Sequence, residues 1–238
     1  MSALQIPGSS CARALPPSLR VVAGANSLWR LNTDELLDAI AAPEPTPGGG
    51  SVAIRAACLG TALVRKAFAV SLRKDRGDGS TDELPAALRD LDRREIILRG
   101  SVDRDAGAFD SYLRALRLPR ASLGEAKIRE KAIEHGLVRA TCVPTAAAAA
   151  IRSIAALALR HFERVHDVVL TDAVTGLNLL HTSAACLLVT AEDNRRKIAQ
   201  SVFCEKLASQ AEELTVAIGQ AEADLAARLR SPDPLKTG

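Results

Sequence analysis

Apolar residues recur every three or four positions along most of the chain from Thr33 onward. That spacing places them on one side of an α-helix, and no alternation typical of a β-strand is sustained beyond four residues. The pattern predicts a short helix that ends at Pro43, five long helices and a last apolar stripe. We expect them over residues 33–42, 51–74, 81–116, 122–142, 144–162, 167–190 and 194–229. The sequence therefore predicts an all-α helical bundle of about six to seven helices.

Length and composition favour one helical domain. A chain of 238 residues with 47% hydrophobic residues can bury one substantial core, and its 3% aromatic content favours helices that approach closely. We expect a single domain over residues 33–230 and a tail over 231–238. Residues 1–32 lack acidic side chains, as organelle transit segments do, but Pro16-Pro17 interrupts any amphipathic helix there. We interpret them as a disordered or loosely attached leader.

The charge and cysteine patterns argue against several classes of protein. With a net charge of +3 and with basic and acidic residues interspersed, we expect no nucleic-acid partner. No apolar run approaches the roughly 18 residues that cross a bilayer, so we expect no membrane partner. Five widely spaced cysteines without a Cys-x-x-Cys motif predict reduced thiols in a cytoplasmic protein. The four histidines lack metal-ligand spacing, so we expect no metal site.

The predicted helix over 51–74 carries a ridge of small residues, along which a neighbouring backbone can approach closely. These residues are Ala53, Ala56, Ala57, Gly60 and Ala67. Long alanine and leucine faces of the other helices would stay exposed to water in an isolated bundle. We therefore expect a homodimer, in which a second copy of the chain covers them.

The turn from Pro45 to Ser51, with the sequence Pro-Thr-Pro-Gly-Gly-Gly-Ser, is the first candidate for chemistry. Prolines stiffen its entry, glycines widen its backbone freedom, and Ser51 is suited to cap the following helix. Backbone N–H groups at this positive helix end could bind a carbonyl or anionic group of a small molecule. A tight connection without a ligand would have the same composition, so both interpretations stay open. The candidate substrate-binding residues are Pro47, Gly48, Gly49, Gly50 and Ser51.

Three later segments extend the pattern that begins with this turn. They are Asp105-Ala106-Gly107-Ala108-Phe109-Asp110 before Leu118-Pro119, Val143-Pro144 before an alanine-rich helix, and Thr171-Asp172-Ala173 at the start of another helix. In order and approximate spacing, the four landmarks resemble those of the family that comprises the cyclodeaminase half of formiminotransferase-cyclodeaminase and the related bacterial methenyltetrahydrofolate cyclohydrolases. The resemblance covers about residues 34–229, and the glycine turn is its most specific part.

Members of that family are all-helical homodimers that act on one-carbon folates. The resemblance therefore implies a tetrahydrofolate derivative as substrate and no tightly bound cofactor. In one family reaction, water adds to the methenyl carbon of methenyltetrahydrofolate and the ring opens. In the other, a nitrogen attacks a formimino carbon and ammonia leaves. Both reactions move protons at a tetrahedral centre, a task that suits a carboxylate and needs no metal ion.

Asp172 and Asp105 are the candidate catalytic carboxylates. Asp172 lies among apolar residues at a helix start, where burial would raise its proton affinity, although a helix-capping role worth about 1 kcal/mol would explain it equally simply. Asp105 and Phe109 are four residues apart, so a carboxylate and a ring share a helix face, with a solvated helix surface as the alternative. We expect Asp172 and the glycine turn to meet in one cavity.

Arg73 and Lys74, at the end of the predicted helix over 51–74, are candidates for binding the glutamate carboxylates of the substrate. Basic residues also stabilise a helix C-terminus without any ligand, so neither interpretation is preferred.

The chain also departs from the family pattern. After the segment around Asp172 the family typically continues with glycine and alanine, and later with an asparagine followed by arginine. This chain has Val174-Thr175 and then Thr190-Ala191-Glu192, so the asparagine is missing at that place. Loss of a polar anchor leaves two alternatives open. One is a relative recruited to cyclise or deaminate a non-folate substrate, and the other is a non-catalytic helical dimer.

Overall fold

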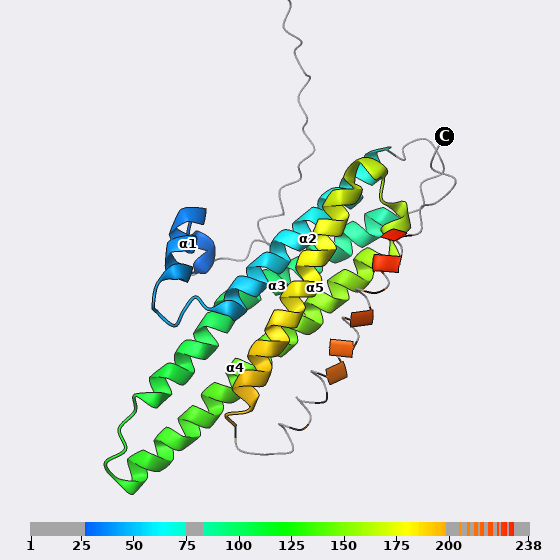
Figure 1. The fold of residues 1–238 in the computed structure, drawn as a ribbon. Coiled ribbons are helices and arrows are strands. Elements are labelled where there is room, and N and C mark those ends of the chain that lie inside the picture. Colours follow the sequence, from blue (N-terminus) through cyan, green and yellow to red (C-terminus); the bar gives the residue numbers. More distant parts are fainter. Residues whose placement is uncertain are drawn as a thin grey trace, which may run out of the picture.

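The computed structural model describes residues 27–74 and 83–198, together with single positions of a helical segment between 205 and 230. Its long helices are α2 (Gly49–Lys74), α3 (Glu83–Leu116), α4 (Leu123–Arg160) and α5 (Leu170–Arg195). α2 and α4 each pack against both α3 and α5, which forms a four-helix bundle (Figure 1). The all-α prediction is confirmed.

Neighbouring helices in the bundle run antiparallel. Ser51 near the start of α2 contacts Asp105 in the second half of α3, whereas Arg65 further along α2 pairs with Asp92 further back in α3. The order along one helix is therefore reversed along the other. This arrangement brings the start of α2 and the end of α5 to the same end of the bundle (Figure 1).

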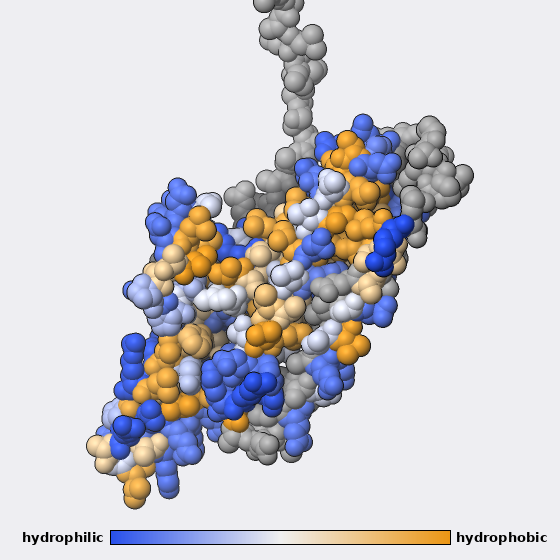
Figure 2. Space-filling view, viewed as in Figure 1, coloured by the Kyte–Doolittle hydropathy of each residue, from blue (hydrophilic) through white to orange (hydrophobic). Residues whose placement is uncertain are grey.

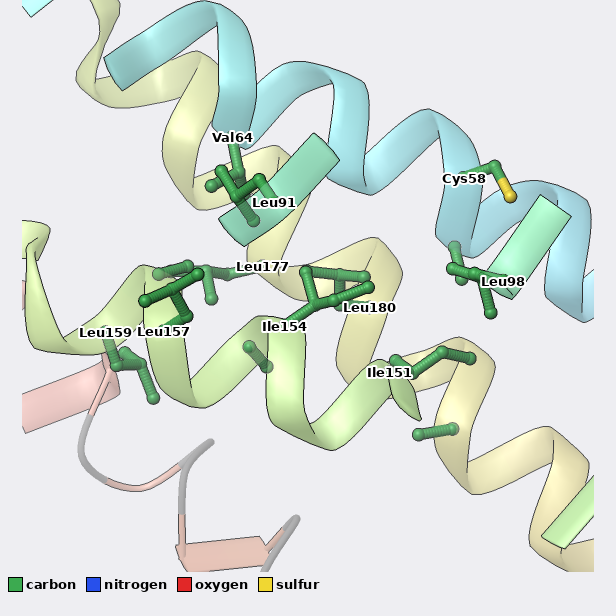
Figure 3. Packing of buried hydrophobic residues seen from close by; sticks show 14 of the residues in the cluster. Cys58, Val64, Leu91, Leu98, Ile151, Ile154, Leu157, Leu159, Leu177 and Leu180 are labelled. Atoms are coloured by element: carbon green, nitrogen blue, oxygen red, sulfur yellow. The ribbon is translucent and has the colours of Figure 1, made fainter. Parts of the chain in front are cut away.

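The core between the long helices is aliphatic. Figure 3 shows side chains from all four helices that meet there. The labelled ones include Val64, Leu91, Leu98, Ile151, Ile154, Leu177 and Leu180, which are almost completely buried. The closest helix contact joins Gly60 of α2 and Gly176 of α5, because a Cβ added to either glycine would lie 2.7 Å from the carbonyl oxygen of the other. The close approach predicted for the small-residue ridge is thus confirmed at Gly60.

The short elements are η2 (Leu28–Arg30), α1 (Thr33–Ala41), η3 (Phe162–Arg164) and η4 (Asp167–Val169). α1 begins at a capping box, in which Asn32 and Glu35 exchange hydrogen bonds of 2.9 Å between side chains and backbone N–H groups. It contains no buried residue and lies to one side of the bundle (Figure 1). α1 is therefore held by its own caps and by the segments that flank it.

The segment before α1 is docked, contrary to the leader predicted over residues 1–32. The Ser27 hydroxyl and the Leu28 N–H donate to the Asp103 carboxylate at 2.6 and 2.9 Å. Trp29 lies between the guanidinium groups of Arg55 and Arg99, each 4.8 Å from its ring centroid. These contacts tie residues 27–31 to α2 and α3. The rest of the predicted leader and the tail over 231–238 lie outside the described residues.

Several helix boundaries differ from the sequence prediction. α5, predicted over 167–190, spans Leu170–Arg195 and so includes Asn194. α2 begins at Gly49 rather than Ser51, so Ser51 is not the capping residue and its hydroxyl is directed to Asp105 instead. α4 is one continuous helix with Pro144 inside it, whereas the sequence predicted one helix up to residue 142 and another from Pro144. Much of the stripe predicted over 194–229 lies outside the described residues.

α4 and the segment Asp167–Arg195 are long and apolar enough to cross a membrane by length and composition. The sequence pattern had predicted no apolar run of that length. About half of the most apolar stretch in each is buried inside the protein, as in the core helices of soluble proteins, so their apolar character is weak evidence for a membrane span.

Candidate functional site

A cleft of about 260 Å³ lies at the end of the bundle where α2 begins and α5 ends. All four long helices contribute to its wall, together with the turn that precedes α2. The lining residues are Pro45, Thr46, Gly48, Gly49, Gly50 and Ser51 from the turn and α2, Asp105, Ala106 and Phe109 from α3, Ala140 from α4, and Thr190, Asp193, Asn194 and Lys197 from the end of α5 and beyond.

Asp105 is a largely buried carboxylate in this cleft. Its Oδ2 accepts a hydrogen bond of 2.9 Å from the Ser51 hydroxyl. The backbone N–H of Ser51 also donates a hydrogen bond to this carboxylate. Burial raises the pKa of the Asp105 carboxyl above its ordinary value, and the hydrogen bonds from Ser51 offset part of that rise. Asp105 is thus a desolvated carboxylate with a raised proton affinity, and it lies beside the N-terminus of α2.

Gly50 is the residue that lets Asp105 lie so close to α2. A Cβ at Gly50 would collide with the carboxylate of Asp105, whose three outer atoms are its nearest neighbours. At Gly49 a Cβ would meet nothing within 4 Å, and at Gly48 it would approach only the Pro45 carbonyl oxygen at 3.4 Å. Of the three glycines in the turn, Gly50 is therefore the one that the packing requires.

The turn itself is held by α3. The Thr46 hydroxyl donates to Asp110 Oδ1 at 3.1 Å, and the Thr46–Pro47 peptide bond is cis. Pro47 is buried beneath the turn and does not line the cleft. Carboxylates of α3 therefore hold both the turn before α2 and the first turn of α2.

Asn194 lines the cleft and supplies a hydrogen bond that Pro144 removes from within α4. Pro144 has no N–H, so the carbonyl of Ala140, four residues earlier, lacks its helical donor. The Asn194 side-chain amide donates to that carbonyl at 2.9 Å. Both residues are buried, so this bond satisfies a backbone group that water cannot reach.

Asn194 was not predicted as a site residue, although the sequence carries a signal for it. The resemblance predicts an asparagine followed by arginine after the Asp172 helix start, and Asn194-Arg195 has that order. The pair begins two residues after Glu192, further along the same helix α5. Asp193 and Lys197, which were not predicted either, form an ion pair of 2.6 Å in the cleft wall.

The structure brings together only part of the predicted site. Gly48, Gly49, Gly50, Ser51, Asp105 and Phe109 all line the cleft. Asp172 does not, because it lies at the opposite end of α5, eighteen residues before Thr190 and ~27 Å away along the helix axis. It pairs there with Lys66 at 2.8 Å. The predicted meeting of Asp172 with the glycine turn is therefore wrong for a single chain.

Arg73 and Lys74 also lie away from the cleft. They end α2, whose first residue is Gly49, so the length of that helix, ~36 Å, separates them from the glycine turn. Arg73 donates weakly to the Ala69 carbonyl at 3.4 Å, as basic residues do in the last turn of a helix. Among the described residues, no group of three or more histidine, cysteine or acidic side chains is arranged to hold a metal ion.

The fold and the cleft define an all-helical protein with an open cleft at one end of an antiparallel bundle. A family model described as formiminotransferase-cyclodeaminase matches residues 32–213, and the chain belongs to that family. The resemblance identified from the sequence is thereby confirmed.

Individual relatives agree with this assignment. The chain is 26% identical over 186 residues to the methenyltetrahydrofolate cyclohydrolase of Methylorubrum extorquens, which covers 78% of this chain and 89% of that protein. It is 32% identical over 116 residues to the formimidoyltransferase-cyclodeaminase of Gallus gallus, or 49% of this chain and only 21% of that longer protein.

A solved structure supports the fold. The crystal structure of formiminotetrahydrofolate cyclodeaminase from Thermotoga maritima superposes with a TM-score of 0.71 at 21% identity. The match covers 82% of this chain and 94% of that one. The bundle described above is therefore the fold of this relative over almost its whole length.

Proposed function

We propose that this protein is a one-carbon folate enzyme that hydrolyses methenyltetrahydrofolate, with Asp105 as the group that transfers protons. The observation that carries the proposal is the Asp105 carboxylate, largely desolvated in a cleft at the glycine-rich start of α2. The Methylorubrum relative, named as a methenyltetrahydrofolate cyclohydrolase and matched over 89% of its length, supports the choice of substrate.

The chemistry suits a buried carboxylate. The methenyl carbon shares a positive charge with the two nitrogens bonded to it, and a carboxylate in a partly desolvated cleft attracts such a cation strongly. As general base, Asp105 accepts a proton from the water whose oxygen bonds to that carbon. Asp105 then returns the proton to the nitrogen whose bond to the carbon breaks. The hydroxyl proton of the tetrahedral centre goes to solvent, and a formyl group remains.

Other cleft residues have roles in binding under this proposal. The first N–H groups of α2, at Gly49 and Gly50, have no acceptor within their helix and can bind a carbonyl or carboxylate oxygen. Phe109 lies one helical turn after Asp105 and offers an apolar surface to a flat ring. The raised pKa makes Asp105 a stronger base than an aspartate on the surface.

A second candidate is the cyclisation of formiminotetrahydrofolate with loss of ammonia. The 32% identity to the formimidoyltransferase-cyclodeaminase of Gallus gallus favours it. The same carboxylate would take the proton from the attacking nitrogen and give it to the departing ammonia. The two reactions are separated by their products, since only the second one releases ammonia.

The test uses purified full-length protein with each folate. Hydrolysis is followed as the loss of the near-ultraviolet absorbance of methenyltetrahydrofolate above the rate in buffer, and cyclisation is followed as ammonia released. We expect Asp105→Asn to lower kcat by about 10²–10⁴-fold, the usual contribution of a positioned general base. Asp90→Asn, a half-buried position on the same helix α3 that lies outside the cleft and pairs with Arg93 and Arg94, is the matched control.

Asp172→Asn decides between the two predicted carboxylates. Because Asp172 lies at the other end of α5, we expect its kcat to stay within about twofold of the wild-type value. A large loss with Asp172→Asn and none with Asp105→Asn would overturn the assignment of Asp105. If neither folate reacts faster than in buffer, the folate proposal is wrong, and the recruited enzyme or the non-catalytic dimer takes its place.

A further inference from the structure

α1 is an acidic helix with an uncovered apolar side. Between Leu31 and Ile54 the chain has four acidic residues and no basic one, which gives this stretch a net charge of −4. Leu37 is 58% exposed and Ile40 is 36% exposed, and no residue of α1 is buried. None of the other described helices packs extensively against it. The helix therefore presents apolar and negatively charged side chains together.

The tip of the hairpin between α3 and α4 has the opposite charge. Over residues 114–131 six basic side chains and two acidic ones give a net charge of +4. Leu123 is 85% exposed and Ile128 is 65% exposed. The tip extends beyond the rest of the bundle, and the space-filling view shows apolar atoms at its end, with hydrophilic ones beside them (Figures 1 and 2). It is thus an exposed apolar surface surrounded by positive charge.

We propose that α1 of one copy of this chain docks on the α3–α4 hairpin tip of a second copy. The two surfaces are complementary, because each carries exposed apolar side chains and their net charges of −4 and +4 are opposite in sign. In a dimer with two-fold symmetry the contact forms twice, once for each α1, so both uncovered helices are covered together.

The contact bears on the cleft. α1 ends at Ala41, and within seven residues the chain reaches Gly48 in the cleft wall. Thr46 and Ser51 hold the intervening turn against α3. Docking of α1 on a second copy restrains the same turn from its other side, so assembly supports the geometry of the glycine turn.

Charge reversal on each surface tests the contact. In the first variant, Asp34→Lys, Asp38→Lys and Glu44→Lys make the α1 region basic, and the capping residues Asn32 and Glu35 are kept. In the second, Arg117→Glu, Arg120→Glu and Lys127→Glu make the tip acidic, and Arg129 is kept because it donates to the Leu116 carbonyl. All six altered side chains are exposed. Circular dichroism checks that each variant keeps its helices.

Sedimentation velocity gives the dissociation constant of the dimer. We expect a wild-type dimer, and for each variant alone a Kd at least about 100-fold higher, because like charges then face each other at both contacts. An equimolar mixture of the two variants restores the dimer, since each reversed surface meets a reversed partner. The chain with all six changes also dimerises. Reversal of Glu205, Glu212 and Glu213 to lysine, three exposed acids of the C-terminal segment, is the matched control and leaves Kd unchanged.

Several results would overturn the proposal. One is a wild-type protein that stays monomeric at 50 µM. A monomer whose hairpin tip binds vesicles of anionic lipid would count against the proposal in the same way. A second is dimerisation of both variants with the wild-type Kd, which would place the interface elsewhere, for example on the uncharged outer side of α5. A third is failure of the mixture to dimerise although both variants are folded. If one triple variant does not fold, the chain with all six changes is tested in its place. If that chain is folded but monomeric, the proposed contact is wrong.

Discussion

At the scale of single residues, the site depends on backbone and side-chain groups that lack their usual partners. Burial leaves Asp105 short of water, and Ser51 supplies hydrogen bonds in its place. Pro144 leaves the Ala140 carbonyl without its helical donor, and Asn194 supplies one. Gly50 leaves out the side chain that would displace the Asp105 carboxylate. The three features at Asp105, Asn194 and Gly50 can be tested separately.

The first prediction concerns Asp105 and pH. Burial raises the pKa of this carboxyl, so between its unfolded value near 3.8 and its higher folded value the folded state binds the proton that the unfolded state lacks. The contribution of Asp105 to stability therefore falls as the pH rises through this window. Asp105→Asn removes that loss, so we expect Tm of the variant minus Tm of the wild type to increase from pH 3.5 to pH 7. A difference that is constant or decreases with pH would contradict the desolvated environment.

The second prediction concerns Gly50. Alanine there would push the Asp105 carboxylate away from the start of α2, and a displacement of about 1 Å can cost roughly 100-fold in rate. We expect Gly50→Ala to lower kcat for the folate substrate by about 10–100-fold while the far-ultraviolet circular dichroism is unchanged. Gly107→Ala, in α3 with nothing within 4 Å of the added Cβ, is the control and keeps the wild-type kcat.

The third prediction concerns Asn194 and Pro144. Asn194→Ala leaves the buried Ala140 carbonyl unpaired, which costs about 1–3 kcal/mol of unfolding free energy. In a Pro144→Ala background, the new N–H at position 144 can satisfy that carbonyl, so the same change should cost less. Urea unfolding of the two single variants and the double variant measures the coupling, which we expect to exceed about 0.5 kcal/mol. Strict additivity would show that Asn194 acts independently of the hydrogen bond that Pro144 removes from α4.

At the scale of elements, small residues decide which helices can be neighbours. Gly60 and Gly176 allow the backbones of α2 and α5 to touch, and Gly136 gives α4 a similar approach to Tyr112 of α3. Helical period and composition predicted the small ridge of α2 correctly, since these are local properties of the sequence. The period could not predict that α4 continues through Pro144, because the donor that replaces the missing N–H comes from α5, fifty residues later.

The fourth prediction follows from the glycine contact. Gly60→Ala or Gly176→Ala places a methyl group against an immovable carbonyl oxygen and forces α2 and α5 apart. We expect a loss of about 1–3 kcal/mol in the free energy of unfolding, as for other overpacked cores. Gly107→Ala serves again as control, because alanine in an open helical position stabilises by about 1 kcal/mol relative to glycine. Equal stabilities for the three variants would contradict the close contact.

At the scale of the whole molecule, the direction of each helix decides which candidate residues meet. The glycine turn, Asp105 and Phe109 lie at one end of the bundle with the end of α5, whereas Asp172, Arg73 and Lys74 lie towards the other end. The two carboxylates predicted to act together are therefore far apart in one chain. The uncovered α1 and the hairpin tip also belong to this scale, since a second copy is needed to pair them.

The fifth prediction is that thermal stability depends on protein concentration. A dimer that forms only in the folded state adds RT ln(1 + [L]/Kd) to stability, which is about 2.7 kcal/mol when the partner exceeds Kd 100-fold. We expect Tm of the wild type to rise steadily from 1 to 100 µM, and Tm of either charge-reversal variant to change much less over this range. Calorimetry measures both. A wild-type Tm independent of concentration would contradict assembly in the folded state.

The sequence by itself determined the helical class, most helix boundaries, the family, and the glycine turn with Asp105 and Phe109. These follow from local period, capping residues and short motifs, which need no knowledge of distant contacts. Only the tertiary structure decided that Asp105 rather than Asp172 lies in the cleft, that Asn194 completes its wall, and that residues 27–31 are docked. The physical reason is that antiparallel packing sets which helix ends meet, and that the partners of a buried polar group can come from anywhere in the chain.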